Sequence, residues 1–134
     1  MSTISLLSPG GLVTSPAFSH VAVVPPGAAT VYVGGQNAVD ATGALVGGDD
    51  PAAQTRQVMA NLVTALEAAG AGLSDVVSMT VLLVDGVDVT GAYGAAAETL
   101  AGLTVPPLVT AALVSGLGVP GALVEVGAVA AVMP

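Results

Sequence analysis

The apolar residues of this chain come in short runs, and glycine, proline or aspartate ends most of them. Two of the clearest runs are Val76–Val84 and Leu108–Val114. No run reaches the ~18 apolar residues of a membrane-spanning helix, and short apolar runs between turn-forming residues are typical of buried strands. Hydrophobic residues nevertheless make up 54% of the chain, which is too many for a disordered protein. The sequence therefore predicts a folded protein with several strands.

Two segments favour helices instead. The first follows Asp49 and Asp50, either of which can cap a helix, and Pro51 suits a first turn. Its apolar side chains recur at helical spacing, at Val58, Met59, Leu62, Val63 and Leu66. The second segment, 87–101, is rich in alanine and is weakened by two glycines.

Further strands are expected at 18–24, 29–34 and 122–132. Strands thus alternate with two helices, and no linker or long repeat divides the chain, so we expect a single domain over residues 1–134. This order predicts an α+β two-layer sandwich, in which one mixed β-sheet carries both helices on one face. The other sheet face is then bare, and we expect other subunits to bury it.

The charge balance excludes several partners. Nine acidic residues stand against one basic residue, Arg56, which gives a formal net charge of −8. Nucleic acids and anionic membranes are bound through several lysines and arginines, so neither partner is expected. Cysteine is absent and His20 is the only histidine, which excludes thiolate and histidine-rich metal sites. The first residues lack the basic segment of a secretory signal, so a cytoplasmic location is expected.

Glu125 is the first candidate for chemistry because it interrupts an apolar strand. Strand alternation puts it on one face with Leu123 and Gly127. A carboxylate on a packed sheet face is costly unless it is paired or protonated, and such a group is a candidate general acid or base. The structural alternative is a solvated strand end. His20, whose ordinary titration is near neutral pH, is a second catalytic candidate, or else a structural residue.

Six stretches of the chain, taken in order, carry a family resemblance. They are VYVGGQ (31–36), AAQTRQVMANL (52–62), DVVSMTVLLVD (75–85), AYG (92–94), VPP (105–107) and PGALVEV (120–126). Together they resemble the Rid/YjgF family of reactive-intermediate deaminases, also called the endoribonuclease L-PSP family. The likeness extends over residues 15–133, nearly the whole chain.

The resemblance implies a chorismate-mutase-like fold, assembled as a homotrimer with a barrel-like core and clefts between subunits. It also implies hydrolysis of small-molecule imines and enamines to 2-oxo acids and ammonia, without a metal or an organic cofactor. The family's glutamate, which helps to place the attacking water, corresponds to Glu125. Its G-Q motif, which borders the cleft, corresponds to Gly35 and Gln36.

Other family positions differ in this chain. A tyrosine of the cleft falls on Phe18, and an asparagine at the start of the second helix falls on Thr90. The arginine that binds the substrate carboxylate falls on Leu108, or on Val109 if the loop is shifted by one residue. Neither side chain can replace an arginine–carboxylate contact. We therefore expect an apolar cleft, with Thr110 beside these residues, that suits an imine, enamine or amine lacking a carboxylate.

Three functions remain open on the sequence. The first is an enzyme in which Glu125 is the acid/base for hydrolysis, tautomerisation or dehydration of a small apolar substrate. The second is a non-catalytic trimer that binds a small apolar or amine ligand, and the third is a scaffold or an engineered variant kept for its assembly. The older label of endoribonuclease is disfavoured because a chain of net charge −8 repels RNA.

Overall fold

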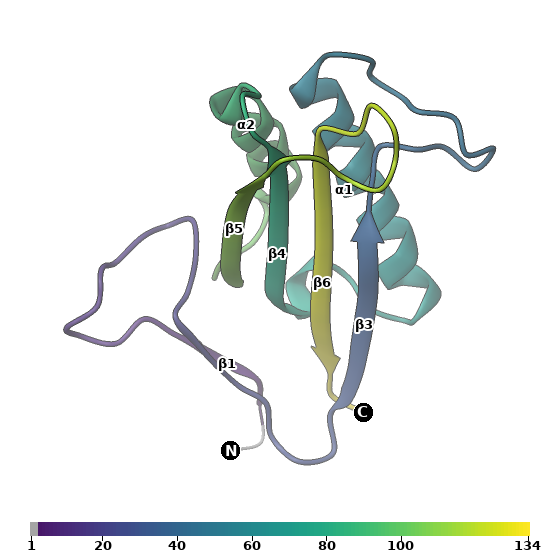
Figure 1. Ribbon diagram of the computed structural model, residues 1–134. Helices are drawn as coiled ribbons and strands as arrows, with labels where there is room; N and C mark the ends of the chain where they lie inside the picture. The colour runs from purple at the N-terminus through teal and green to yellow at the C-terminus, as the bar shows by residue number, and fades with distance from the viewer. Residues whose placement is uncertain (1–2) are drawn as a thin grey trace.

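The structure is a computed structural model and describes residues 3–134. Its elements follow the chain as β1 (Ser5–Leu7), β2 (Val21–Val23), β3 (Ala29–Gln36), α1 (Pro51–Ala68), β4 (Val76–Val84), α2 (Val89–Leu100), β5 (Leu108–Val114) and β6 (Val124–Val132), with a short 3-10 helix at Leu73–Asp75. Four strands form the main sheet, and β1 pairs with β2 in a separate two-stranded sheet (Figure 1).

The main sheet has the order β3-β6-β4-β5 and is mixed. The strand β6 runs antiparallel to both β3 and β4, whereas β4 and β5 are parallel. Parallel neighbours need a crossover connection, and α2 provides it. Because β6 lies between β3 and β4, a strand from the last third of the chain joins strands from its first and middle thirds.

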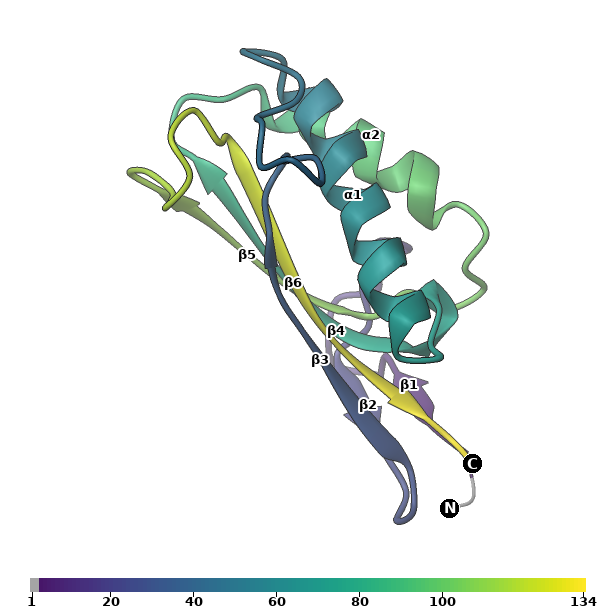
Figure 2. The ribbon, with the colours of Figure 1, turned by 90° about the vertical axis from the view of Figure 1, so that its right-hand side faces the viewer.

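Both helices cover the same face of the sheet, and within residues 3–134 the opposite face carries no helix (Figure 2). The sequence-based prediction of an α+β two-layer architecture with one mixed sheet is therefore confirmed. The core lies between the layers. It contains the stripe of α1 and the alternate side chains of the central strands, namely Val58, Met59, Leu62, Leu66, Val76, Met79, Leu83, Val124, Val126, Ala128 and Ala130.

The first helix begins and ends where its sequence signals lie. The Asp50 side chain accepts a hydrogen bond of 3.0 Å from the Ala52 amide, and Pro51 occupies the first turn. After Ala68 the chain turns at Gly70, whose φ of +73° suits a residue without a Cβ. An N-cap such as Asp50 stabilises a helix by about 1 kcal/mol.

The segment predicted as a strand over 18–24 is extended for a shorter length, and β2 contains only Val21–Val23. The residues before it make different contacts. The Ser19 amide donates to the Pro107 carbonyl at 3.0 Å, and the Ser19 hydroxyl donates to the Pro106 carbonyl at 2.6 Å. Ser19 is thereby bound to the start of β5, whereas β2 pairs with β1.

Candidate functional site

Glu125 lies on the sheet face opposite the two helices. Its neighbours in β6, Val124 and Val126, are buried on the helix side, so alternation turns Glu125 to the open face. Its carboxylate lies over Gly35 of β3, where a Cβ added to the glycine would be 2.5 Å from Glu125 Oε2. The pairing of β3 with β6 therefore brings together two residues that are distant in sequence.

A bulge in β3 shapes the surroundings of this carboxylate. The register with β6 shifts between Val33 and Gln36, so Gly34 and Gly35 have no register partners. Bulges of this kind are common beside active sites. Gly127 lies next to the bulge, because a Cβ there would be 3.8 Å from Gly35 Cα. Gly35 and Gly127 thus leave the surface beside Glu125 without side chains.

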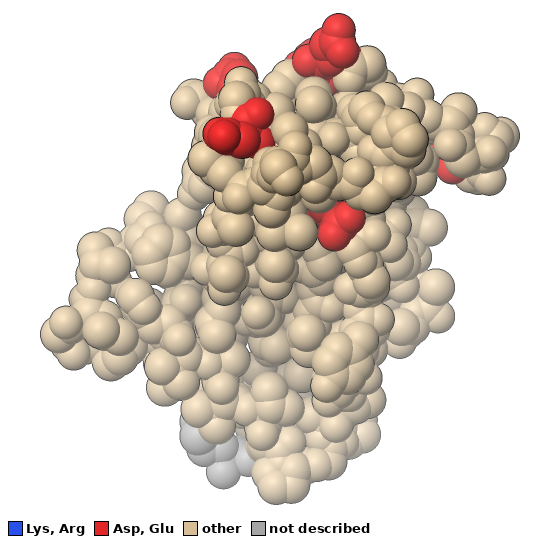
Figure 3. Space-filling view, viewed as in Figure 1, with Lys and Arg blue, Asp and Glu red and all other residues tan. Residues whose placement is uncertain are grey.

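The arginine and the histidine of the chain make their contacts elsewhere. Arg56 Nε on α1 lies 3.3 Å from Glu98 Oε2 on α2. His20 Nε2 donates to the Val13 carbonyl at 2.6 Å, since a carbonyl oxygen can only accept. On the sheet face opposite the helices, the described residues form separate acidic patches, and no basic side chain is visible (Figure 3). Neither Arg56 nor His20 thus forms an ion pair or hydrogen bond with Glu125.

Leu108 and Thr110 also belong to the open face, but at a distance from Glu125. On β4, Leu108 pairs with Ser78 whereas Glu125 pairs with Leu82. Strand geometry therefore separates the Cα atoms of Leu108 and Glu125 by about 16 Å within one chain. The same reasoning puts Thr110, opposite Thr80, about 12 Å away.

Val109 and Phe18 lie on the helix side of the sheet, away from Glu125. Both line a cavity of about 440 Å³ between α2 and the sheet. The Phe18 ring contacts the His20 ring edge to face, with centroids 5.3 Å apart. The structure therefore divides the residues predicted for one site between the two faces of a single chain.

Gln36 and Thr90 lie at the ends of elements. Gln36 is the last residue of β3, and its side-chain amide donates to the Gly34 carbonyl at 3.1 Å, which ties the bulge to the strand end. Thr90 is exposed in the first turn of α2, which Asp88 caps by accepting from the Gly91 amide. Gln36 thus lies near the Gly35–Glu125 contact, whereas Thr90 belongs to the helix layer.

The structure also shows a polar residue that the sequence reasoning missed. Gln54 is fully buried in α1. Its amide donates to the carbonyls of Gly48 at 2.7 Å and Gly121 at 3.0 Å, and its oxygen accepts from the Leu123 amide at 2.8 Å. Gln54 therefore fixes the segment that enters β6 just before Glu125. Its place four residues before Val58, on the apolar stripe, is the signal that marks it as buried.

The loop that follows β3 is held by Asp40. Its carboxylate accepts from the Thr42 hydroxyl at 2.6 Å and from the amides of Thr42 and Ala44 at 2.9 and 3.1 Å. The Thr42 hydroxyl, followed by these backbone amides, lowers the pKa of Asp40 below its ordinary value. The loop is thereby closed by side-chain hydrogen bonds on its way to α1.

Other site classes find no support within residues 3–134. No three acidic or histidine side chains in this range are grouped so that they could hold a metal ion. Within the same range, no helix has the length and apolar character needed to cross a membrane.

Comparisons with known proteins agree with the fold and extend over the same length of chain. The family model described as Endoribonuclease L-PSP matches residues 12–132. A Rid-family protein of unknown function, YyfB from Yersinia pestis, is 32% identical, with 97% of this chain and 98% of that chain covered and a TM-score of 0.83. A search of curated proteins found no match.

Two more solved structures show the same fold at lower identity. The yjgF gene product of Escherichia coli is 28% identical over 80% of this chain and 83% of its own, with a TM-score of 0.68. A Mycobacterium tuberculosis member of the YjgF/YER057c/UK114 family is 28% identical over 97% of this chain and 100% of its own, with a TM-score of 0.64. With a family model that matches most of its length, the chain belongs to the Rid/YjgF/L-PSP family.

Proposed function

We propose that this protein hydrolyses imines, or enamines that tautomerise to imines, whose carbon skeleton carries no carboxylate, with Glu125 as the general acid and base. The observation that carries the proposal is the position of the Glu125 carboxylate, over Gly35 at a bulge and apart from Arg56 and His20. A substrate carboxylate would be repelled there because no described cation faces it. A neutral or cationic imine suits the same carboxylate.

The chemistry follows from a single carboxylate. Glu125 accepts a proton from water as the water oxygen bonds to the imine carbon, and it then returns the proton to the nitrogen. The product of this addition is a carbinolamine, and Glu125 then transfers its hydroxyl proton to the amine nitrogen. The carbon–nitrogen bond breaks as the carbon–oxygen double bond forms, so one imine and one water give one carbonyl compound and one ammonia. The glycine-lined surface formed by Gly35 and Gly127 gives the substrate room beside the carboxylate.

A homotrimer is part of the proposal, because one chain leaves the predicted cleft incomplete. Leu108 is about 16 Å from Glu125 within a chain, so a single cleft that holds both must take them from two subunits. Tyr32 on the open face is 79% exposed. The accessible surface of 7009 Å² also exceeds the roughly 6,200 Å² of a compact monomer of this mass. Light scattering should give a mass of about 38 kDa, three times 12.7 kDa.

The test compares two imines that differ by a carboxylate. A flavin amine oxidase converts phenethylamine to the carboxylate-free imine, and a flavin L-amino acid oxidase converts phenylalanine to its α-imino acid. Ammonia release is followed with and without the protein. We expect acceleration with the first imine and at least tenfold less with the second.

Variants assign the reaction to the site. Glu125→Gln should lower the catalysed rate at least 100-fold, whereas Glu67→Gln, which changes an exposed carboxylate at the end of α1, should not lower it. A rate that survives Glu125→Gln would refute the assigned role. Faster turnover of the α-imino acid would refute the substrate class.

A non-catalytic ligand-binding function is the second candidate. His20 is engaged with Val13 and Arg56 with Glu98, and within residues 3–134 no hydrogen bond or ion pair joins Glu125 to a second titratable side chain. Saturable binding of phenethylamine without acceleration of either imine, from a folded protein, would establish this function in place of the enzyme.

A further inference from the structure

The cavity between α2 and the sheet is formed because α2 presents small side chains to its neighbours. The buried residues of α2 are Ala92 and Ala95, and Ala96 and Ala97 line the cavity beside them. Alanines opposite β4 and β5 leave space that larger side chains would fill. The resulting volume of about 440 Å³ lies within the range of small-molecule pockets and is about three times that of a cavity that binds benzene.

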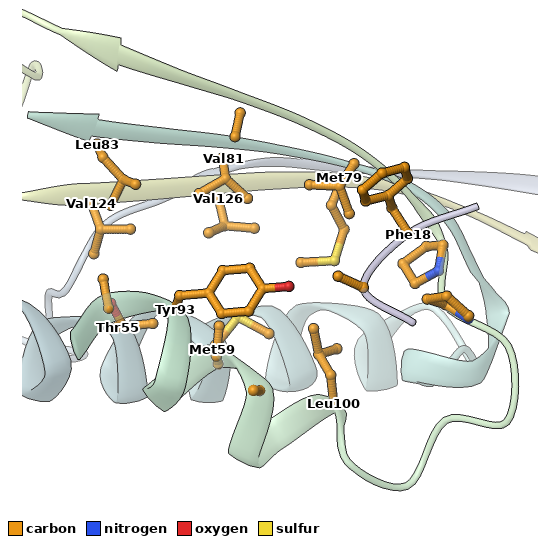
Figure 4. A pocket seen from close by; sticks show the side chains of 18 of the residues that line it. Phe18, Thr55, Met59, Met79, Val81, Leu83, Tyr93, Leu100, Val124 and Val126 are labelled. Atoms are coloured by element: carbon orange, nitrogen blue, oxygen red, sulfur yellow. The ribbon is translucent and has the colours of Figure 1, made fainter. Parts of the chain in front are cut away.

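The residues that line this cavity favour one chemical class of ligand as well as one range of ligand size. The chain has three aromatic residues and four methionines. Two of the aromatics, Phe18 and Tyr93, and two of the methionines, Met59 and Met79, line the cavity (Figure 4). Aromatic rings pack on one another, and methionine sulfur makes favourable contacts with rings. The scarce groups that favour an aromatic ligand are thus concentrated at one place.

The polar groups of the cavity are few. No Asp, Glu, His, Lys or Arg is among its described lining residues. The Thr55 hydroxyl already donates to the Pro51 carbonyl at 2.7 Å. The Tyr93 hydroxyl makes no hydrogen bond within residues 3–134, and it points along the cavity toward the end lined by Phe18 and Met79 (Figure 4). An ionised ligand would lose its hydration in this cavity and find no group of opposite charge in return. A single acceptor atom on a neutral ligand, in contrast, can accept a hydrogen bond from the Tyr93 hydroxyl.

The cavity is open to solvent beside α2. Tyr93 is 59% exposed and Val109 is 37% exposed, so a ligand can enter between the helix and β5. The other end is closed by the segment at Pro16–Phe18, which Ser19 fixes to the Pro106 and Pro107 carbonyls. The sheet separates this cavity from Glu125, because Val124 and Val126 line it from β6 while Glu125 faces the opposite side.

We propose that this cavity is a second binding site, separate from the Glu125 face, for a neutral aromatic molecule of about two fused rings with one hydrogen-bond acceptor. Tyr93 donates a hydrogen bond to the acceptor, and the methionines and Phe18 contact the rings. The proposal does not depend on catalysis at Glu125.

Three probes of matched shape test the ligand class. They are 2-acetylnaphthalene, which has an acceptor, 2-ethylnaphthalene, which has none, and 2-naphthoate, which is ionised. Fluorescence titration of the full chain should give saturable binding of both neutral probes, and 2-naphthoate should bind at least tenfold more weakly than the ketone. Absence of saturable binding of the ketone, or equal binding of 2-naphthoate, would overturn the proposal.

Variants locate the site and assign Tyr93. Tyr93→Phe should weaken 2-acetylnaphthalene about fivefold and leave 2-ethylnaphthalene unchanged, which is the effect of one lost hydrogen bond. Equal effects on both probes would overturn the role of Tyr93. Ala96→Leu should reduce binding of both neutral probes at least tenfold, whereas Ala60→Leu, on the exposed side of α1, should not.

If Ala96→Leu does not fold, as judged by circular dichroism, Ala111→Leu fills the same cavity from β5. Binding that survives the folded filling variant, or that Ala60→Leu also removes, would show that the probes bind elsewhere. Glu125→Gln should leave the binding of all three probes unchanged. A change there would place the probes on the open face and refute the second site, whatever the imine assay shows.

Discussion

Replacing Gly35 by alanine should lower the catalysed rate and leave the free energy of unfolding nearly unchanged. The added methyl would lie 2.5 Å from Glu125 Oε2 and 2.7 Å from Cδ, whereas ordinary contact begins near 3.4 Å. The carboxylate must therefore move by about 1 Å, and a displacement of that size in a reacting group costs on the order of 100-fold in rate.

The same substitution should hardly change the free energy of unfolding. Glu125 is displaced at the far end of a flexible side chain, where an unfavourable rotamer costs about 1 kcal/mol. Alanine restricts the unfolded chain more than glycine, which returns about 0.4–1 kcal/mol. The two effects nearly cancel, so the midpoint of thermal unfolding should stay close to that of the unchanged protein.

Gly34→Ala is the matched control, because a Cβ at Gly34 meets no atom within 4 Å. We expect Gly34→Ala to keep the rate on the phenethylamine-derived imine within about twofold, while Gly35→Ala loses about 100-fold with similar thermal unfolding. Equal rates for the two variants would refute the argument that the position of Glu125 over Gly35 sets the activity.

Three further predictions follow from single contacts. Leu108→Arg should raise turnover of the α-imino acid about 10-fold to 100-fold relative to the carboxylate-free imine, as one charged hydrogen-bonded pair would; unchanged selectivity would contradict the proposed shared cleft. Gln54→Ala removes three buried hydrogen bonds and should lower the free energy of unfolding in urea by about 2–4 kcal/mol, whereas Gln57→Ala should cost less than about 1 kcal/mol; equal losses would contradict the role of Gln54. Because the pKa of Asp40 is lowered in the folded state, its stabilising effect is present above its ordinary pKa of 3.8 and is lost as the pH falls through the folded value. Carboxyl NMR titration should therefore show a higher Asp40 pKa in Thr42→Val than in the unchanged protein, and an unchanged pKa would show that the Thr42 hydroxyl is not the main cause.

Local signals in the sequence predicted most of the elements. The runs Val76–Val84 and Leu108–Val114 became β4 and β5 with the expected bounds, because turn-forming residues flank each run. The first helix is predicted by its capping aspartate, by the proline of its first turn and by the helical spacing of its apolar side chains. These signals come from residues that are close together in the sequence. The placement of both helices on one sheet face followed from the order of the elements.

Contacts between segments that are distant in sequence could not be predicted from such local signals. The approach of Gly35 to Glu125 depends on the register of β3 with β6, which a bulge shifts. The burial of Gln54 depends on carbonyls that two separate loops supply. The cavity beside α2 depends on the distance at which an alanine-rich helix packs. Each of these is a property of tertiary packing rather than of neighbouring residues.

The central position of β6 has a consequence for how the chain folds. This strand follows all the others in sequence, yet β3 and β4 meet only through it. Until β6 inserts, both of those strands expose unpaired edges, and edges of this kind attract strands from other chains. Closing the sheet also requires contacts across most of the chain, which slows folding relative to a protein with local pairing. We therefore expect the sheet to be complete only once β6 has inserted, and partly folded chains that lack this pairing to be prone to aggregation.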